Sequence, residues 1–388
     1  MSLLVPPTST ARVDAVDVAR GIALLGMMFV HLGPRWMDED PPWGQMVASG
    51  RAAPLFALLA GVALSLVHRR DPQGAGSKRA TCIRALVLVA MGLSLGSLDD
   101  MPVYVILAFY GVLIVIALPF RSLPTRWLLG LGLAWAVVVP VLLLWLQIVH
   151  EPVVSDQAGL SDLVPPWSLV MELVVWGAYP AGVWFAYVLV GLGVGRLDLG
   201  DLRTALRVLA GGVVLLGGTL AVGATAIARG VFDDWYVEGW RQLFVRGTYP
   251  YEQPTWHELW LVGEHTSRPL NVLGAIGSAL VVVGLCALAV RLPWSRRVLT
   301  PLRAAGSMTL TLYTVHVLWT WRQSIDAMAS DGGPANGTYR DWLVQVVVLC
   351  AVAVVWQRWI GRGPLESAIR FVSVRRRTPS AEPSSVGH

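Results

Sequence analysis

The sequence predicts an all-α protein, a polytopic transmembrane helix bundle of about ten spans with both termini on the cytoplasmic side. Of its 388 residues, 55% are hydrophobic and only 14% are charged, whereas soluble domains carry about a quarter charged residues. Apolar stretches of roughly 17–25 residues, long enough to cross the hydrocarbon core, follow one another with short gaps. Basic residues gather in alternate connections, which is the pattern that sets membrane orientation.

The predicted spans follow one another along the chain. They run over residues 15–36, 52–68, 82–98, 102–120, 126–149, 180–196, 204–228, 269–290, 301–321 and 341–360. The start of the chain has no small-residue cleavage site after a short apolar core, so we expect the first span to be retained and not removed as a signal peptide. With the N-terminus inside, the inner connections hold most of the 30 Lys and Arg residues, and this alternation supports an even number of spans.

Two long connections, residues 150–179 and 229–268, are predicted on the outer side, and the first is expected to lie flat or to re-enter the membrane. The second contains five aromatic residues before Trp256: Trp235, Tyr236, Trp240, Tyr249 and Tyr251. Its length and aromatic density favour a functional role over disorder. Residues 1–362 are predicted to form a single transmembrane domain. Residues 363–388 are predicted to form a cytoplasmic interfacial helix and a disordered tail.

Ionisable residues in the first span are the main functional signal, because charge inside a bilayer is costly. Arg20 and His31 are eleven positions apart, which at about 100° per residue puts both on one face, roughly 16 Å apart along the axis. Asp17 precedes Arg20 by three positions, a spacing that allows pairing on the helix surface. One interpretation is structural: an Asp17–Arg20 pair and an ordinary boundary histidine. The functional interpretation makes His31 a general base reached from outside, because the pKa of histidine lies near neutrality.

A second intramembrane histidine, His316, lies late in the ninth predicted span. That span is predicted to run in the same direction as the first, so we expect His316 at nearly the depth of His31. Thr309, Tyr313 and His316, or Thr320, recur at three- and four-residue steps and share a face. Thr and Tyr also hydrogen-bond neighbouring helices in membranes, so a structural interpretation stays open.

Metal and nucleotide chemistry find little support. The pairs His257-Glu258 and Glu264-His265 do not have the His-Glu-x-x-His spacing, so we expect a solvated loop, with a zinc site as the alternative. The three cysteines form no Cys-x-x-Cys pattern, which argues against a thiolate metal site or a disulfide framework. No glycine motif for phosphate binding occurs, so ATP-driven transport and nucleotide redox chemistry are not indicated.

A basic cluster follows the second predicted span on the cytoplasmic side. It consists of His68, Arg69, Arg70, Lys78, Arg79 and Arg84. The cluster fits the orientation rule and also suits the phosphates of a cytoplasmic cofactor. The inner loops account for the net charge of +5, so nucleic-acid binding is not indicated.

Several stretches resemble known families. Residues Asp14–His31 resemble the first helix of the transmembrane acyltransferases, which include acyltransferase family 3 and the heparan-α-glucosaminide N-acetyltransferase-like proteins. The spacing of Arg20 and His31 is similar to the Arg-x10-His pattern of family 3, and residues 54–61 resemble the start of the second helix in both groups. Later stretches resemble the YeiB-like bacterial membrane family: Tyr110–Leu113, Gly177–Trp184, Gly195–Asp198, Gly306–His316 and Gly363–Glu366.

This resemblance implies transfer of an acyl group, acetyl in the first instance, from cytoplasmic acetyl-CoA or another acyl-CoA to an acceptor on the outer side of a bacterial plasma membrane. The acceptor is expected to be a carbohydrate or lipid-linked molecule. The resemblance implies that His31 deprotonates the acceptor and that Arg20 steadies the acyl donor, with no metal. The Arg-x-x-Arg pattern of family 3 is absent, and Lys78-Arg79 and Arg84 are the nearest basic residues.

We therefore expect an acyl-CoA-dependent O- or N-acyltransferase of the cell envelope, for which a homo-oligomer is one of the assemblies considered. The catalytic candidates are His31, Arg20 and His316. The donor-binding candidates are Arg69, Arg70, Lys78, Arg79 and Arg84. The acceptor-binding candidates are Arg51, Glu172, Tyr179 and Tyr313. The alternatives are a permease or flippase that uses the same polar groove and a non-catalytic partner of a cell-envelope enzyme.

Overall fold

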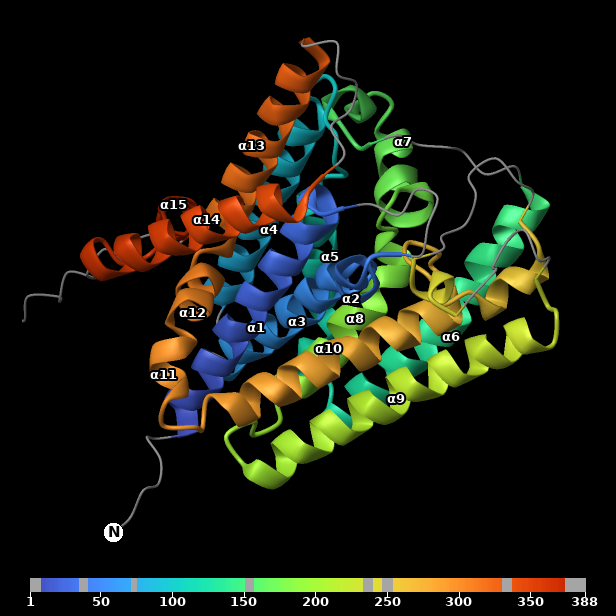
Figure 1. Ribbon diagram of the computed structural model, residues 1–388, viewed down its shortest axis with the longest axis horizontal. Helices are drawn as coiled ribbons and strands as arrows, with labels where there is room; N and C mark the ends of the chain where they lie inside the picture. The colour runs from blue at the N-terminus through green and yellow to red at the C-terminus, as the bar shows by residue number, and fades with distance from the viewer. Residues whose placement is uncertain are drawn as a thin grey trace, which may run out of the picture.

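The computed structural model describes residues 8–34, 41–70, 75–150, 157–232, 240–245, 254–329 and 337–373. Within these ranges every regular element is a helix and no strand occurs, which confirms the all-α transmembrane bundle. Figure 1 shows the helices gathered into one body, in which they cross at several different tilts. The predicted tail, which begins at residue 378, lies outside the described residues, as do the aromatic residues at 235, 236, 249 and 251.

The long helices follow the predicted spans in order. They are α1 (Thr8–Leu32), α3 (Ala52–Arg70), α4 (Ala75–Gly96), α5 (Leu107–Ala117), α6 (Thr125–Val149), α8 (Ala181–Val194), α9 (Leu202–Ala228), α10 (Pro269–Ala289), α13 (Thr309–Ala329) and α14 (Tyr339–Trp359). The shorter ones are α2 (Trp43–Ala48), η1 (Pro119–Ser122), η2 (Leu160–Leu163), α7 (Pro166–Met171), η3 (Glu172–Trp176), η4 (Gln242–Phe244), η5 (Trp256–Trp260), α11 (Ser295–Val298), α12 (Thr300–Ser307) and α15 (Pro364–Ser373).

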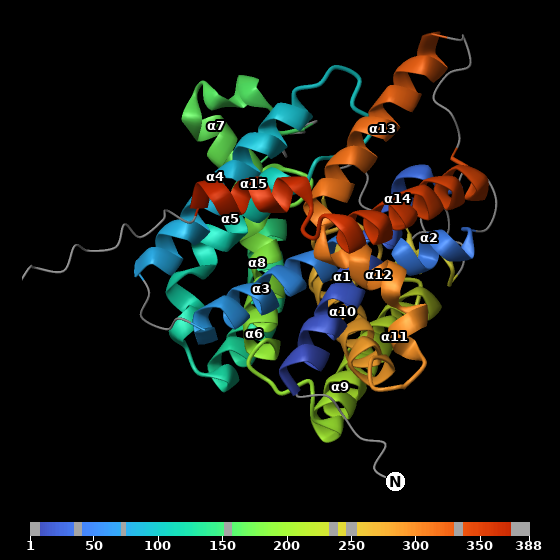
Figure 2. The ribbon, with the colours of Figure 1, turned by 90° about the vertical axis from the view of Figure 1, so that its left-hand side faces the viewer.

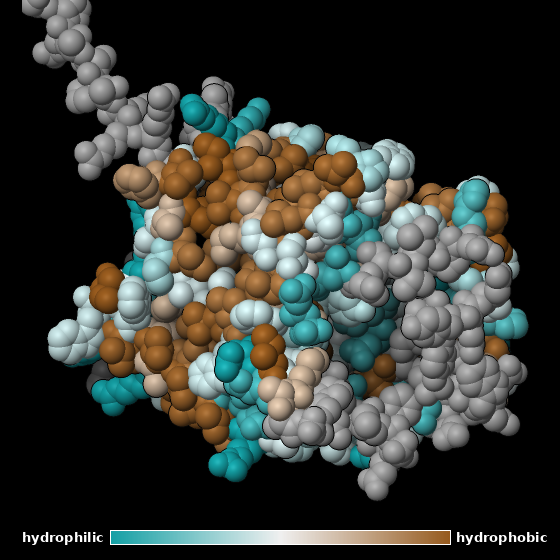
Figure 3. Space-filling view, turned by 90° about the horizontal axis from the view of Figure 1, so that it is seen from above, coloured by the Kyte–Doolittle hydropathy of each residue, from teal (hydrophilic) through white to brown (hydrophobic). Residues whose placement is uncertain are grey.

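Six helices in the described ranges are long and apolar enough to cross a membrane, or up to seven when the bent segment of α7, η3 and α8 counts as one span. The number of about ten spans and their orientation therefore stay predictions. Large apolar side chains on α6, α9 and α14 are exposed, among them Trp145, Val214 and Val347, and Figure 3 shows wide apolar areas on the surface. Soluble monomers rarely expose such areas, so these side chains are suited to face lipid.

Two predicted membrane segments are not straight. The span predicted over 301–321 is divided at Met308 into α12 and α13. The first N–H groups of α13 are bonded by α15: the backbone N–H groups of Leu310 and Thr311 donate to Glu366 Oε1 at 2.8 and 3.2 Å. A carboxylate that satisfies these groups stabilises a new helix start at this point. Residues 166–176 meet α8 at 58°, in the connection that was predicted to lie flat or re-enter.

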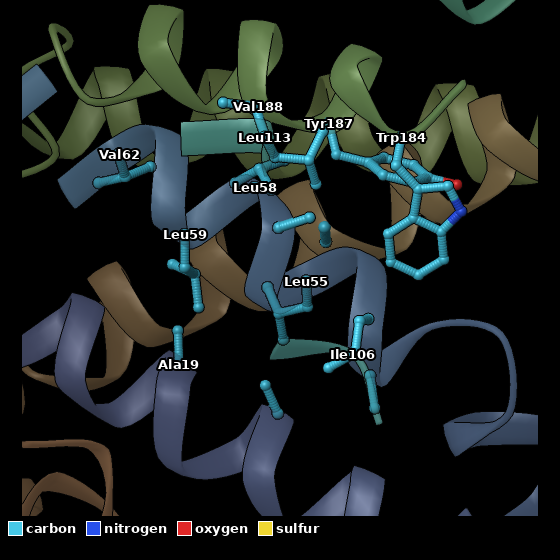
Figure 4. Packing of buried hydrophobic residues seen from close by; sticks show 14 of the residues in the cluster. Ala19, Leu55, Leu58, Leu59, Val62, Ile106, Leu113, Trp184, Tyr187 and Val188 are labelled. Carbon is cyan, nitrogen blue, oxygen red and sulfur yellow. The ribbon is translucent and has the colours of Figure 1, made fainter. Parts of the chain in front are cut away.

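Helix α8 lies at the centre of the bundle. All its residues from 183 to 194 are buried, and it packs against α3 and α6. A β-carbon on Gly191 would lie 2.0 Å from the carbonyl oxygen of Leu58, so only glycine permits the close approach of α3. Figure 4 shows Leu58 of α3 beside Tyr187 and Val188 of α8. This rigid contact supports the wall of the candidate site.

Helices α1 and α12 cross closely at two glycines. A β-carbon on Gly306 would lie 1.7 Å from the carbonyl oxygen of Asp17, and one on Gly21 would lie 2.2 Å from that of Leu302. Because α13 follows directly from α12, this crossing sets the position of α13 relative to α1. In Figure 2, α15 runs across this side of the bundle near α4 and α13.

Candidate active site

Two histidines meet between α1 and α13. Nδ1 of His31 lies 2.8 Å from Nε2 of His316, and the two rings are parallel to within 1° with centroids 5.1 Å apart. His316 is fully buried, whereas His31 is half-buried. The two histidines that the sequence predicted at one depth are therefore in direct contact.

The orientation of His316 is set by α14 and by its own helix. Its Nδ1 lies 2.5 Å from Oε1 of Gln345, a side chain that is 1% exposed, and the hydroxyl of Thr320 donates to the carbonyl of His316 at 2.9 Å. An amide oxygen can only accept a hydrogen bond, so Nδ1 of His316 carries the proton and its Nε2 accepts from Nδ1–H of His31. In this arrangement the lone pair of neutral His31 is on Nε2. A general base requires a lone pair of this kind.

His31 lines a cavity of about 420 Å³ near the end of α1. Other walls come from the residues just after α1, from α2 and the residue that follows it, from the segment before α5, from the η3–α8 turn and from the loop after η5. The polar and aromatic groups in these walls are Gln45, Ser49, Tyr104, Tyr179, Glu264 and His265. A neighbouring cavity of about 30 Å³ is lined by His31, Tyr179 and His265 together with Trp184 and Asn271. Aromatic surface with a few polar groups is typical of sites for small ligands.

The loop over residues 261–268 brings His265 to this cavity. At its end, Arg268 forms an ion pair with Glu258, and the Arg268 side chain is only 3% exposed. Nδ2 of Asn271 donates to two carbonyls of the loop at 3.2 and 2.7 Å. His265 is exposed, but most of the loop around it is buried and not solvated as predicted, and these bonds hold its backbone in one place.

Tyr179 is the predicted acceptor-binding residue that the structure places in the cavity. Its hydroxyl donates to the carbonyl of Tyr104 at 3.5 Å, and its ring meets His265 edge-on with centroids 5.4 Å apart. Arg51 lies beside the cavity and not in its wall: its guanidinium donates to the carbonyls of Met46 and Ser49 at 2.7 and 3.0 Å. Arg51 therefore braces the α2–α3 turn.

Two other acceptor-binding candidates are buried away from the cavities that His31 lines. Glu172 is 7% exposed in η3 and Tyr313 is 4% exposed in α13, and neither is among the lining residues. The hydroxyl of Tyr313 accepts a hydrogen bond from the backbone N–H of Ile106 at 3.4 Å. Both residues support the bundle around the site, and their role as acceptor ligands stays a prediction.

Arg20 lies further along α1 and pairs with Asp17, as the three-residue spacing predicted, at 3.1 Å. It is not among the residues that line the two cavities at His31. Arg84 of α4 lies near enough for its charge to interact with those of Arg20 and Glu366. The structure thus brings one donor-binding candidate close to Arg20.

The other donor-binding candidates have different surroundings. Arg69 donates to the carbonyl of Arg196 at 3.3 Å, and Lys78 and Arg79 are exposed at the start of α4. The side chain of Arg70 lies outside the described part of the structure.

The zinc alternative gains no support from the described residues. In those ranges no group of three or more His, Cys, Asp and Glu side chains is arranged to hold a metal ion. Glu258 is engaged by Arg268, so its carboxylate holds the loop over residues 261–268.

Two site residues were missed by sequence reasoning. Gln345 is a lone polar residue in an apolar helix, and a search for polar residues inside spans would have found it. His265 was discounted because its spacing does not fit a metal motif, although it lies in the long outer connection that was expected to be functional.

Comparison with known proteins gives two matches. A family described as "Heparan-alpha-glucosaminide N-acetyltransferase, catalytic" matches residues 12–222. A family described as "Protein of unknown function (DUF418)" matches residues 244–376. No match to a curated protein was found. The first segment contains His31 and Tyr179, and the second contains His265 and His316, so both segments contribute to the candidate active site.

Proposed function

We propose that this chain, which belongs to the heparan-alpha-glucosaminide N-acetyltransferase catalytic family, is a multi-pass membrane acyltransferase that uses acyl-CoA as its donor. The acyl group, acetyl in the first instance, passes from the cytoplasmic side to a sugar or lipid-linked acceptor in the cavity at His31. The observation that carries the proposal is the chain of hydrogen bonds from His31 through His316 to Gln345. The His31 end of this chain lies in the wall of the cavity, where an acceptor can reach the base.

In the proposed reaction His31 acts as the general base. Its Nε2 takes the proton of an acceptor hydroxyl or amine while the acceptor oxygen or nitrogen forms a bond to the thioester carbonyl carbon. The C–S bond then breaks, and the CoA sulfur leaves with the proton returned by the His31 imidazolium. The imidazolium formed in between keeps its Nδ1–H on His316, and a hydrogen bond from a charged donor is stronger than the same bond in the neutral pair.

The donor is proposed to enter from the end of the bundle where Arg20 and Arg84 lie. Guanidinium groups pair well with phosphates, and Arg20, although paired with Asp17, lies near the guanidinium of Arg84. Arg20 is assigned a role in steadying the donor, about two to three helical turns along α1 from the cavity wall. Phosphate binding by Arg69, Lys78 and Arg79 is part of the same proposal.

The test is release of CoA by the purified protein, given acetyl-CoA and an α-glucosaminide. We expect transfer in the wild type and a loss of about 10²–10⁴-fold in kcat for His31→Ala, the usual contribution of a general base. His150→Ala is the matched control, because His150 is exposed at the end of α6. Equal turnover in His31→Ala and the wild type would refute the proposed base. Uptake of the glucosaminide into vesicles with no CoA release would favour a permease.

A further inference from the structure

The loop over residues 261–268 has an unusual backbone at the cavity. His265 has φ 53° and Ser267 has φ 52°, in the left-handed region that residues other than glycine rarely adopt. Such backbone is costly and persists only where the surroundings hold it, often at functional sites. Other contacts must therefore hold this backbone, and the side chain that it positions is a candidate for a function.

The compensating structure is a set of buried bonds. The Arg268–Glu258 ion pair holds the loop to η5, and the amide of Asn271 bonds two loop carbonyls. The hydroxyl of Thr266 donates at 3.2 Å to the carbonyl of Gly263, which is one of the two carbonyls that Asn271 bonds. The loop is thus held in one conformation from both ends, although its tip is exposed.

The loop also fits closely against the turn between α2 and α3. A β-carbon on Gly50 would lie 2.9 Å from Cα of Glu264, and Gly50 itself has φ +66°. The close contact presses the loop toward the turn that carries Ser49, another residue of the cavity wall. Residues of the N-terminal and C-terminal matched segments therefore close the cavity together.

The result of this arrangement is the placement of one imidazole. The His265 ring lines both cavities that His31 lines and rests edge-on against Tyr179 at 61°. An imidazole that both donates and accepts hydrogen bonds, next to an aromatic ring, suits the alternating hydroxyl groups and apolar face of a sugar. Its place in the wall differs from that of His316, which is buried behind His31.

We infer that His265 is an acceptor-binding residue, presented to a sugar ring by the strained loop over residues 261–268. The segment of unknown function over 244–376 thereby supplies acceptor recognition, and His31 supplies the base. This inference rests on the proposed function for the identity of the site. It concerns where the acceptor binds and not which residue takes its proton.

The experiment compares His265→Gly with the wild type. Glycine removes the ring and also relieves the positive φ, so a loss cannot be ascribed to backbone strain. We expect the KM for para-nitrophenyl α-D-glucosaminide to rise at least about tenfold, the value of one hydrogen bond. The KM for acetyl-CoA should stay the same, and the Tm should not fall. His265→Asn, which tolerates this backbone and keeps a donor and an acceptor, should recover part of the loss.

His257→Ala is the matched control, because this exposed histidine lies near the same loop but not in the cavity wall. An unchanged KM for the glucosaminide in His265→Gly would overturn the inference. A rise in both KM values, or a lower Tm, would indicate a structural role and overturn it as well. Where the wild type transfers no acetyl group, the glucosaminide should still raise the Tm of the wild type and not that of His265→Gly. An equal rise in both would refute acceptor binding at His265.

Discussion

Replacement of His316 by Phe tests whether the second histidine acts through the first. Phe fills a similar volume in the bundle but cannot accept the hydrogen bond that Nδ1–H of His31 makes at 2.8 Å. When His31 becomes an imidazolium, that bond changes from one between neutral groups, about 0.5–1.5 kcal/mol, to one from a charged donor, about 1.5–3 kcal/mol. The bond is thus about 1–1.5 kcal/mol stronger in the transition state. Its loss should lower kcat about 5- to 15-fold, since 1.36 kcal/mol corresponds to a factor of ten.

The assay is steady-state CoA release with acetyl-CoA and the glucosaminide, with the Tm measured on the same preparations. His316→Phe also leaves Oε1 of Gln345 buried without a donor, so the free energy of unfolding should fall by about 1–3 kcal/mol. His316→Gln, which has an acceptor oxygen, should recover part of kcat. The reasoning is wrong if kcat in His316→Phe equals that of the wild type, or if it falls as far as in His31→Ala. The first result would mean that the bond has no catalytic effect, and the second that His316 is itself indispensable.

Three further predictions concern the stability of the helix bundle. Gly306→Ala places a methyl group against backbone and should destabilise the protein by about 1–3 kcal/mol or more. Gly217→Ala, which adds a methyl group in open space on α9, should not destabilise the protein. Equal melting temperatures of the Gly306→Ala and Gly217→Ala variants would show that the α1–α12 crossing tolerates a β-carbon. Glu366→Ala removes the acceptor for two N–H groups of α13 and should cost about 1–2 kcal/mol, to be measured by thermal denaturation against Glu366→Gln; no change in Tm would contradict this capping. Hydrogen bonds from Thr204 lower the pKa of Asp201, so this cap of α9 stabilises the fold at neutral pH and is lost as the pH falls through the lowered pKa. The difference in Tm between the wild type and Asp201→Ala should therefore shrink in acid, and a difference that grows would refute the assignment.

The sequence predicted the parts of this fold that depend on neighbours along the chain. Hydropathy and length placed the helices, because burial of an apolar side chain in lipid is a property of its own segment. The spacing of Asp17 and Arg20 predicted their ion pair for the same reason, since both lie on one turn of one helix. The break at Met308 could not be predicted in this way, because it depends on Glu366, which lies in a different helix far along the chain.

The candidate site shows the same division. The sequence by itself determined that His31 and His316 occur late in apolar segments, and it predicted that the two histidines lie at similar depth. Only the tertiary structure decided that residues 285 positions apart are hydrogen-bonded, that Gln345 orients the pair, and that His265 reaches the same cavity. These contacts depend on how closely helices approach, which glycines such as Gly306 set through steric contact across helices. The distance between two packed helices cannot be predicted from a pattern of neighbouring residues along the chain.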